Sequence, residues 1–293
     1  MGAECCTSRA PPSSAVEEKS NHIDSRDHSA YSSLQSSLVS SPRNEGSADD
    51  DGLRERIRLA AKSLVLDIPI GPRDVAEGWI SPVTCKGAAI AMDLVDVIRT
   101  NSRDLDFRTY VKRVTIEEGL IGKLLGNFRS ANQSLRRASA FLLSHLVVVS
   151  QYELVRAFVQ EEGVRRLGSL LQGDENEGLV AVVVQMVSVV YGAGGDGATQ
   201  VLDSGTDIIG VLMGKLRKLR IGTHIQQSLQ PVLDLLKQDQ AVARQLLARG
   251  LSDCLQELAY SVRAGQVRVE STPQLASLQQ QLSSMQASVS KVL

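Results

Sequence analysis

The chain begins MGAECC, which places a glycine behind the initiator methionine and two adjacent thiols close to it. Removal of Met1 exposes the α-amine of Gly2, the group that N-myristoylation requires. The usual motif has Ser or Thr at position six, whereas this chain has Cys6 there and Thr7 next. Cys5 and Cys6 are exposed thiols beside this site and are candidates for S-palmitoylation. The sequence therefore predicts lipid attachment at Gly2, Cys5 and Cys6.

Membrane attachment at this end of the chain needs more than one lipid. Each buried CH₂ contributes about 0.8 kcal/mol, and a single myristoyl chain binds membranes only marginally. Residues 1–52 contain four Lys/Arg and nine Asp/Glu, a net charge of −5. An anionic leaflet repels such a segment, so a polybasic signal is absent and palmitate on a cysteine supplies the second one. The alternative is a free terminus with incidental cysteines.

A second segment with possible chemistry is GAGGDG, which fits the G-x-G-x-x-G pattern with Gly192, Gly194 and Gly197. A dinucleotide site requires a strand before this pattern and a helix N-terminus after it. The β-branched run LVAVVVQMVSVV comes before it and is compatible with a strand. The repeat described below instead puts the segment in a turn between two helices. We prefer the helical interpretation.

The other reactive side chains form no catalytic or metal-binding arrangement. Cys85 and Cys254 are isolated, and no His lies at metal-ligand spacing. We expect both cysteines to be inert, buried thiols. His145 has apolar neighbours and is expected to be packed or partly buried rather than to act as a base. The expectation is a non-enzymatic protein without cofactor or metal.

The elements that position these residues follow from an internal repeat. A charged or small pair, a glycine and an amphipathic stretch recur as EEGLIGKLL, EEGVRRLGSLL, DSGTDIIGVLM and ARGLSDCLQEL. The glycines are Gly119, Gly163, Gly205 and Gly250, at spacings of 44, 42 and 45. A break lies about thirteen residues before each glycine, and a long apolar segment precedes it. Each unit therefore predicts a long helix, a shorter helix, a tight glycine turn and a third helix.

Three helices at a period of about 42 residues resemble the armadillo repeat. The predicted fold is all-α, an armadillo-like right-handed α-solenoid with a disordered N-terminal tail. Residues 1–52 are the acylated, Ser-rich tail, because they cannot bury enough apolar surface to fold. Residues 53–83 are a capping helix and linker, and residues 84–263 are the armadillo repeats. Residues 264–293 are a C-terminal capping or coiled-coil helix.

The last predicted helix has apolar residues at alternating spacings of three and four, which is the pattern of a coiled-coil seam. They are Leu275, Leu278, Leu282, Met285, Val289 and Val292. The seam is under three heptads long, which is short for an independent coiled coil. We therefore prefer a helix that folds back to cap the open end of the solenoid, with self-association as the alternative.

Positive charge marks the predicted third helices. The net charge of the whole chain is −1, which gives no indication of nucleic-acid binding, whereas the chain after residue 52 carries +4. In this type of solenoid the third helices line the concave face, the usual binding surface. The prediction is a groove for acidic or phosphorylated protein segments, and the alternative is an ordinary solvated face. Its residues are Lys123, Arg165, Arg166, Lys215, Arg217, Lys218 and Arg220.

With its repeats and its first residues together, the chain resembles the "armadillo repeats only" proteins of apicomplexans and their relatives. The matching features are Gly2, Cys5 and Cys6 and the glycine-marked repeats. The resemblance implies acylation at these residues and a place on the cytosolic face of the rhoptry, a secretory organelle. It also implies that the solenoid recruits a myosin motor and signalling partners to position that organelle.

The functional hypothesis is therefore a lipid-anchored adaptor that binds proteins on the cytosolic face of an organelle membrane. One alternative is a soluble armadillo module that binds proteins without an anchor, and would be cytoplasmic. An enzyme that uses GAGGDG to bind a nucleotide belongs to a third class. The sequence has no apolar segment near its start that would read as a secretory signal.

Overall fold

A computed structural model of the chain describes residues 48–63, 86–150, 152–174, 176–203 and 205–292. Contacts divide the chain into two units, Met1–Asp49 and Asp50–Leu293, and the following concerns the second unit. The predicted lipidation sites, the serine-rich segment before Ala48 and Cys85 lie outside the described residues.

The region predicted as repeats consists of consecutive groups of three helices, each with a long first helix. Within the described ranges all regular elements are helices, apart from an isolated parallel β-bridge between Ile221 and Arg268. The groups are α4 (Lys86–Thr100), α5 (Leu105–Glu117) and α6 (Leu120–Asn127); α7 (Gln133–Ser150), α8 (Tyr152–Gln160) and α9 (Gly163–Gln172); α10 (Glu177–Gly192), α11 (Gly195–Leu202) and α12 (Ile208–Leu216); α13 (Gly222–Gln238), α14 (Gln240–Ala248) and α15 (Leu251–Arg263).

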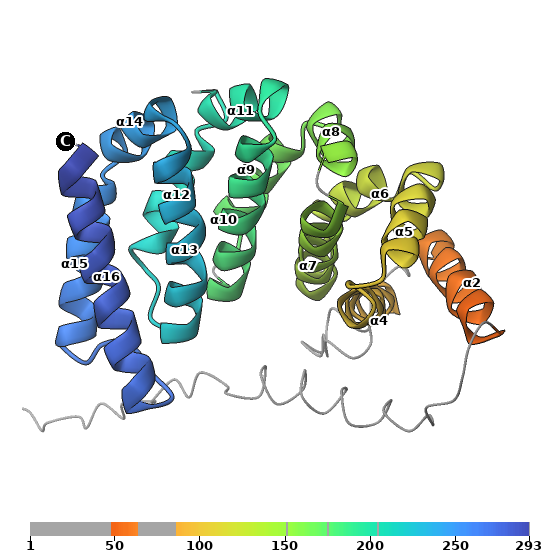
Figure 1. The fold of residues 1–293 in the computed structure, drawn as a ribbon, viewed down its shortest axis with the longest axis horizontal. Coiled ribbons are helices and arrows are strands. Elements are labelled where there is room, and N and C mark those ends of the chain that lie inside the picture. Colours follow the sequence, from red (N-terminus) through yellow and green to blue (C-terminus); the bar gives the residue numbers. More distant parts are fainter. Residues whose placement is uncertain (1–47, 64–85, 151, 175, 204, 293) are drawn as a thin grey trace, which may run out of the picture. The chain divides into compact units, whose positions relative to one another are not determined.

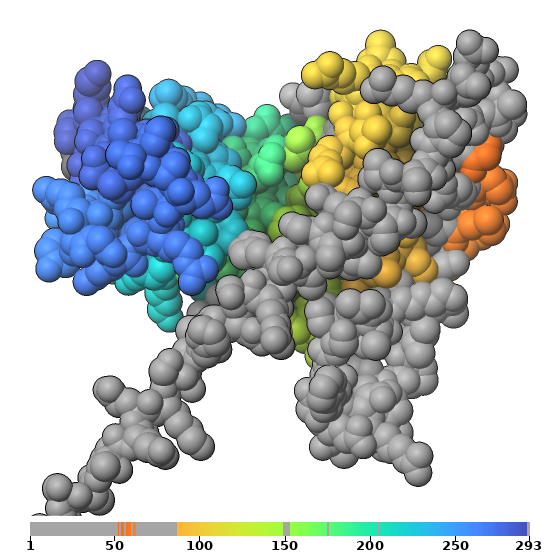
Figure 2. Space-filling view, turned by 90° about the horizontal axis from the view of Figure 1, so that it is seen from below, coloured from red at the N-terminus to blue at the C-terminus, as the bar shows by residue number. Residues whose placement is uncertain are grey.

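Equivalent helices of successive groups pack against one another (Figure 1). Among the first helices, α4 contacts α7, α7 contacts α10, and α10 contacts α13. Among the third helices, α9 contacts α12 and α12 contacts α15. The colours follow the sequence from orange to blue across the helices in both views (Figure 1, Figure 2). This repeated stacking of three-helix groups is an armadillo-like α-solenoid, as predicted.

The β-branched run before GAGGDG is a buried helix. From Leu179 to Val190, only Gln185 and Val189 are not fully buried. Because α10 packs against both α7 and α13, burial of aliphatic side chains on two sides outweighs the low helix propensity of valine. None of the helices in the described ranges combines the length and apolarity needed to cross a membrane.

In the described part of the chain, two further helices flank the repeats. α2 (Ala48–Ser63) begins before the predicted boundary at residue 52, which therefore falls inside the helix. It meets α5 where the Tyr110 hydroxyl donates to the carbonyl oxygen of Arg54 at 2.9 Å. At the other end, α16 (Thr272–Val292) packs against α13 and α15. This is the packing that the preferred prediction, a capping helix, describes. Its buried seam residues are Leu278, Leu282, Met285 and Val289.

Each third helix begins directly after a residue in the left-handed region of backbone space. In the first group this residue is Gly119, with φ of 58°, and in the fourth it is Gly250, with φ of 83°. Both positions were predicted as tight glycine turns. Glycine adopts this conformation without the steric penalty that a Cβ brings.

In the two middle groups, other residues make the same turn. Glu162, with φ of 55°, precedes α9, and Asp207, with φ of 39°, precedes α12. The prediction that Gly163 and Gly205 make the turns is therefore wrong. Gly163 is instead the first residue of α9. A Cβ there would lie 2.3 Å from the ring of Phe158, so the packing of this ring leaves no space for a side chain at position 163.

The two left-handed residues that are not glycine differ in what they contribute. The carboxylate of Asp207 accepts the N–H of Gly210 at 3.2 Å and pairs with Arg249 at 3.0 Å. The carboxylate of Glu162 has an ion pair with Arg165 at 3.8 Å, in which both side chains are exposed. Asp207 thus compensates for its backbone strain, whereas the exposed pair of Glu162 compensates little.

We expect Glu162→Gly to stabilise the protein by up to about 1 kcal/mol, because glycine relieves the left-handed strain. Asp207→Gly is the matched control, since it relieves the same strain but loses a helix cap and an ion pair, and should destabilise by about 1 kcal/mol. Urea unfolding followed by circular dichroism measures both. Destabilisation of similar size in the two variants would contradict this account of the turns.

Candidate functional site

The predicted basic residues all lie on third helices or directly after one. Lys123 is on α6, and Arg165 and Arg166 are on α9. The others cluster at the end of α12 and in the segment that leads to α13: Lys215, Arg217, Lys218 and Arg220.

Two of the basic residues at the end of α12 join neighbouring repeats. Lys215 Nζ donates to the carbonyl oxygen of Asp174, in the loop between α9 and α10, at 2.8 Å. Arg217 Nη2 donates to the carbonyl oxygen of Gly250 at 3.2 Å, and its Nη1 lies 3.8 Å from the carboxylate of Glu257 on α15. These side chains are therefore part of the stacking between repeats.

Arg220 binds the backbone that follows α12 but keeps donors for other contacts. Its Nη1 donates to the carbonyl oxygens of Arg217 at 3.0 Å and Leu219 at 2.8 Å. Its backbone N–H and that of Ile221 donate to Glu177 Oε2 at 2.8 and 2.9 Å. Among the described residues, none accepts a bond from Nε or Nη2 of Arg220, so this exposed guanidinium can bind an additional acceptor.

The basic residues on α9 are paired more weakly. Arg165 and Arg166 lie 3.8 and 3.9 Å from the carboxylates of Glu162 and Glu161. Partly exposed pairs at such distances contribute little to stability. Lys218 is exposed and has no ion pair within the described part of the chain. The predicted row of basic residues thus divides into side chains that hold repeats together and side chains available for a partner.

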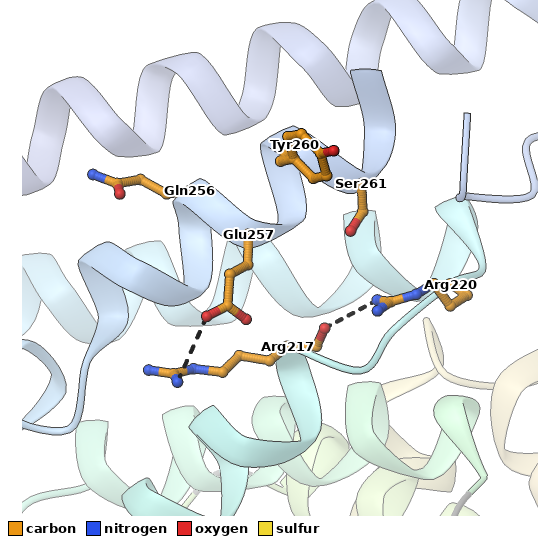
Figure 3. Close-up of a pocket in the computed structure, with 6 residues that line it drawn as sticks. All are labelled: Arg217, Arg220, Gln256, Glu257, Tyr260 and Ser261. Carbon is orange, nitrogen blue, oxygen red and sulfur yellow. Dashed lines mark hydrogen bonds and ion pairs between the residues drawn. The ribbon is translucent and has the colours of Figure 1, made fainter. Parts of the chain in front are cut away.

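A depression of about 400 Å³ lies between the end of α12 and α15. It is lined by Arg217, Arg220, Gln256, Glu257, Tyr260 and Ser261 (Figure 3). Tyr260 is 65% exposed, in a chain in which aromatic residues make up only 3%. Guanidinium, carboxylate, amide, hydroxyl and aromatic groups therefore meet at one place between α12 and α15. Aromatic residues and arginine are enriched at protein–protein interfaces.

Sequence reasoning found the arginines of this depression but missed the residues that α15 contributes. Gln256, Tyr260 and Ser261 lie about forty residues after Arg217 and Arg220. Only the packing of α12 against α15 brings the two groups together. A usable signal was present in α15: Tyr260 lies off the buried face that Leu251, Leu255 and Leu258 form.

A buried acidic residue fixes the loop to which Lys215 binds. The side chain of Asp174 is fully buried and receives two bonds from Arg137, at 3.0 and 3.1 Å. Burial alone would raise the pKa of Asp174. The hydrogen bonds and charge of Arg137, with the bond from the Asn176 N–H, outweigh burial and hold this pKa below its usual value.

The segment GAGGDG joins α10 to α11 and follows a helix, so it lacks the strand that a dinucleotide site requires. A Cβ on Gly197 would lie 2.7 Å from the carbonyl oxygen of Val190, so this glycine allows α11 to approach α10 closely. The segment therefore does not form the strand–loop–helix unit of a dinucleotide site.

The predictions for two other reactive side chains can be compared with the structure. Cys254 is buried, as predicted, and burial raises the pKa of its thiol to about 12, partly opposed by Arg217. His145 is half-buried, as predicted, with Nδ1 3.0 Å from the carbonyl oxygen of Phe141. The described residues contain no cluster of His, Cys, Asp and Glu that could hold a metal ion.

No protein-family model matches the chain, and no curated protein matches it. Among solved structures, an engineered protein from the Northeast Structural Genomics Consortium is 14% identical, with 84% of this chain and 93% of that chain covered, at a TM-score of 0.47. A designed armadillo repeat protein is 11% identical, with 80% and 99% covered, at a TM-score of 0.39. The chain has an armadillo-like fold. Its helix pattern and inter-repeat contacts carry this assignment.

We expect Asp174→Asn to lower the free energy of unfolding at pH 7 by about 3 kcal/mol, because it leaves Arg137 without its charged partner. The folded pKa of Asp174 is depressed, so its stabilisation is present above the unfolded pKa of about 3.9 and is lost as pH falls through the folded value. Urea unfolding at pH 7 and pH 3 should show a gap between wild type and variant that shrinks in acid. An equal difference in stability at both pH values would contradict the conclusion that the ionised Asp174 stabilises the fold through Arg137.

Proposed function

We propose that the protein is a membrane-tethered scaffold that binds protein partners on the third-helix side of its repeats. The observation that carries the proposal is the stack of three-helix groups in the described part of the chain. In it the third helices α9, α12 and α15 contact one another in turn, and a depression lies between α12 and α15. Solenoids of this kind offer extended surfaces for partners.

The tether in this proposal consists of acyl groups at Gly2, Cys5 and Cys6. Support comes from the residue types at the start of the sequence and from the energetic need for a second lipid beside myristate. The acidic composition of residues 1–52 offers no electrostatic substitute for palmitate.

The resemblance to the "armadillo repeats only" proteins extends the proposal to location and partners. On this basis the membrane is the cytosolic face of a secretory organelle such as the rhoptry. The partners are proteins, among them a myosin motor and signalling proteins, and include acidic or phosphorylated segments.

Partner contacts on the third-helix side are assigned to those basic residues that the stacking does not use. Lys215 and Arg217 bond to neighbouring repeats, so their replacement would disturb the fold itself. Lys218 is exposed and Lys123 is half-buried, and within the described residues neither has an ion pair. Charge reversal at these two lysines therefore tests partner binding without breaking an inter-repeat bond.

The tether is tested by fractionation of cells that express the full chain with Gly2→Ala, or with Cys5→Ala and Cys6→Ala together. We expect either change to move the protein from the membrane pellet to the soluble fraction, because one lipid alone is insufficient. Cys254→Ala is the matched control and should leave fractionation unchanged.

Thermal unfolding of the purified variants should match the wild type, which separates loss of the anchor from loss of the fold. If both N-terminal variants fractionate as the wild type does and that fraction is soluble, the unanchored interaction module is correct instead. Imaging of a tagged chain identifies the membrane.

A further inference from the structure

The depression between α12 and α15 has groups that remain available for a ligand. Glu257 and Ser261 extend from α15 toward the end of α12, and the guanidinium of Arg220 points back toward α12 (Figure 3). The two carboxylates nearby are already engaged: Glu257 lies beside Arg217, and Glu177 accepts two backbone N–H groups.

Three cations without an ion pair among the described residues lie in or next to the segment that follows α12: Arg220 lines the depression, and Lys218 and Arg268 are its neighbours in the sequence and across the backbone. Lys218 and Arg220 follow α12, and both are exposed. Arg268 is brought beside Arg220 by the backbone, because its N–H donates to the carbonyl oxygen of Arg220 at 2.7 Å, and its own carbonyl oxygen accepts the Gly222 N–H at 2.8 Å. Arg268 is also exposed. Positive charge from two separate segments therefore converges here.

Other charges near the depression do not cancel this cluster. Asp253 precedes Tyr260 by seven residues on α15, a separation of about 10 Å along the helix. Arg263 follows Tyr260 by less than one turn. Glu270 is exposed, two residues after Arg268. Glu257 lines the depression itself, and its carboxylate is paired with Arg217.

Tyr260 gives the same site an apolar contact. The residue is 65% exposed and lies on a helix whose opposite face is buried. Tyrosine adds contact area at a low cost in conformational entropy and is enriched at protein interfaces. An exposed ring in the same depression as the guanidinium of Arg220 fits a peptide that carries both apolar and anionic side chains.

We propose that this depression binds an acidic peptide segment of a partner protein. Arg220, Lys218 and Arg268 bind its carboxylate or phosphate groups, and Tyr260 packs against an apolar side chain between them. The inference rests on the proposed scaffold function and narrows it to the surface between α12 and α15.

The probe for this proposal is a fluorescein-labelled peptide in which one Phe is flanked on each side by two Glu residues. Binding to the full chain is measured by fluorescence anisotropy. We expect Lys218→Glu combined with Arg268→Glu to weaken binding at least about tenfold. Arg244→Glu, an exposed basic residue on α14, is the matched control and should leave affinity within about twofold.

The tyrosine is tested by a double-mutant cycle. Tyr260→Ser in the protein and Phe→Ser in the peptide should each weaken binding, and the two losses should not add, because each change removes the same contact. Leu105→Ser, at another exposed apolar residue, 72% exposed on α5, is the control and should have no effect. Circular dichroism should show that all variants are folded.

Three results would overturn the proposal: no binding of the peptide at millimolar concentration, equal weakening by Arg244→Glu, or additive losses in the cycle. Replacement of the Glu residues by phosphoserine distinguishes carboxylate from phosphate as the preferred anion. The variant with Lys218→Glu and Arg268→Glu is also tested for binding to phosphatidylserine vesicles. If it loses vesicle binding but keeps peptide binding, the ligand of this site is a lipid surface instead. These variants should not change the membrane fractionation of the full chain, so the proposed tether is tested independently of the depression.

Discussion

The structure depends on the burial of the first helices between their neighbours. A three-helix group cannot cover its own apolar surface, and α10 shows this most clearly, because it needs α7 on one side and α13 on the other. The stack must then end with a helix that offers an apolar face inward and a polar face outward. α16 meets this requirement: its seam packs on α13 and α15, and its exposed residues include Gln279, Gln280, Ser283 and Ser284.

Polar bonds between repeats then fix how the stacked groups are aligned, because apolar contacts alone are not directional. Tyr191 donates to Asp239 at 2.8 Å across one repeat, and Lys215 reaches back to the carbonyl oxygen of Asp174. Arg217 reaches forward to Gly250. Much of the positive charge on the third helices therefore serves the stacking. This use of charge leaves few cations for a partner, and it concentrates them after α12.

The sequence allowed the helices to be predicted because each break has a local cause. The long apolar segments, the break that GAGGDG makes and the left-handed turns at Gly119 and Gly250 all depend on nearby residues. The turns were wrongly assigned to Gly163 and Gly205, because the nearby acidic residues Glu162 and Asp207 adopt the left-handed conformation instead. The depression could not be predicted, since Tyr260 and Arg220 meet only through the packing of α12 on α15.

The position of the depression has a consequence for how binding and stability are linked. Its two walls belong to different repeats, and Arg217 joins them through Gly250 and Glu257. A peptide that contacts both walls binds only when the last two repeats are stacked, so its binding energy adds to their interface. A site within one repeat would not have this effect. The same packing that buries the first helices thus creates the surface for the partner. Binding of the partner therefore depends on the stacking of the last two repeats.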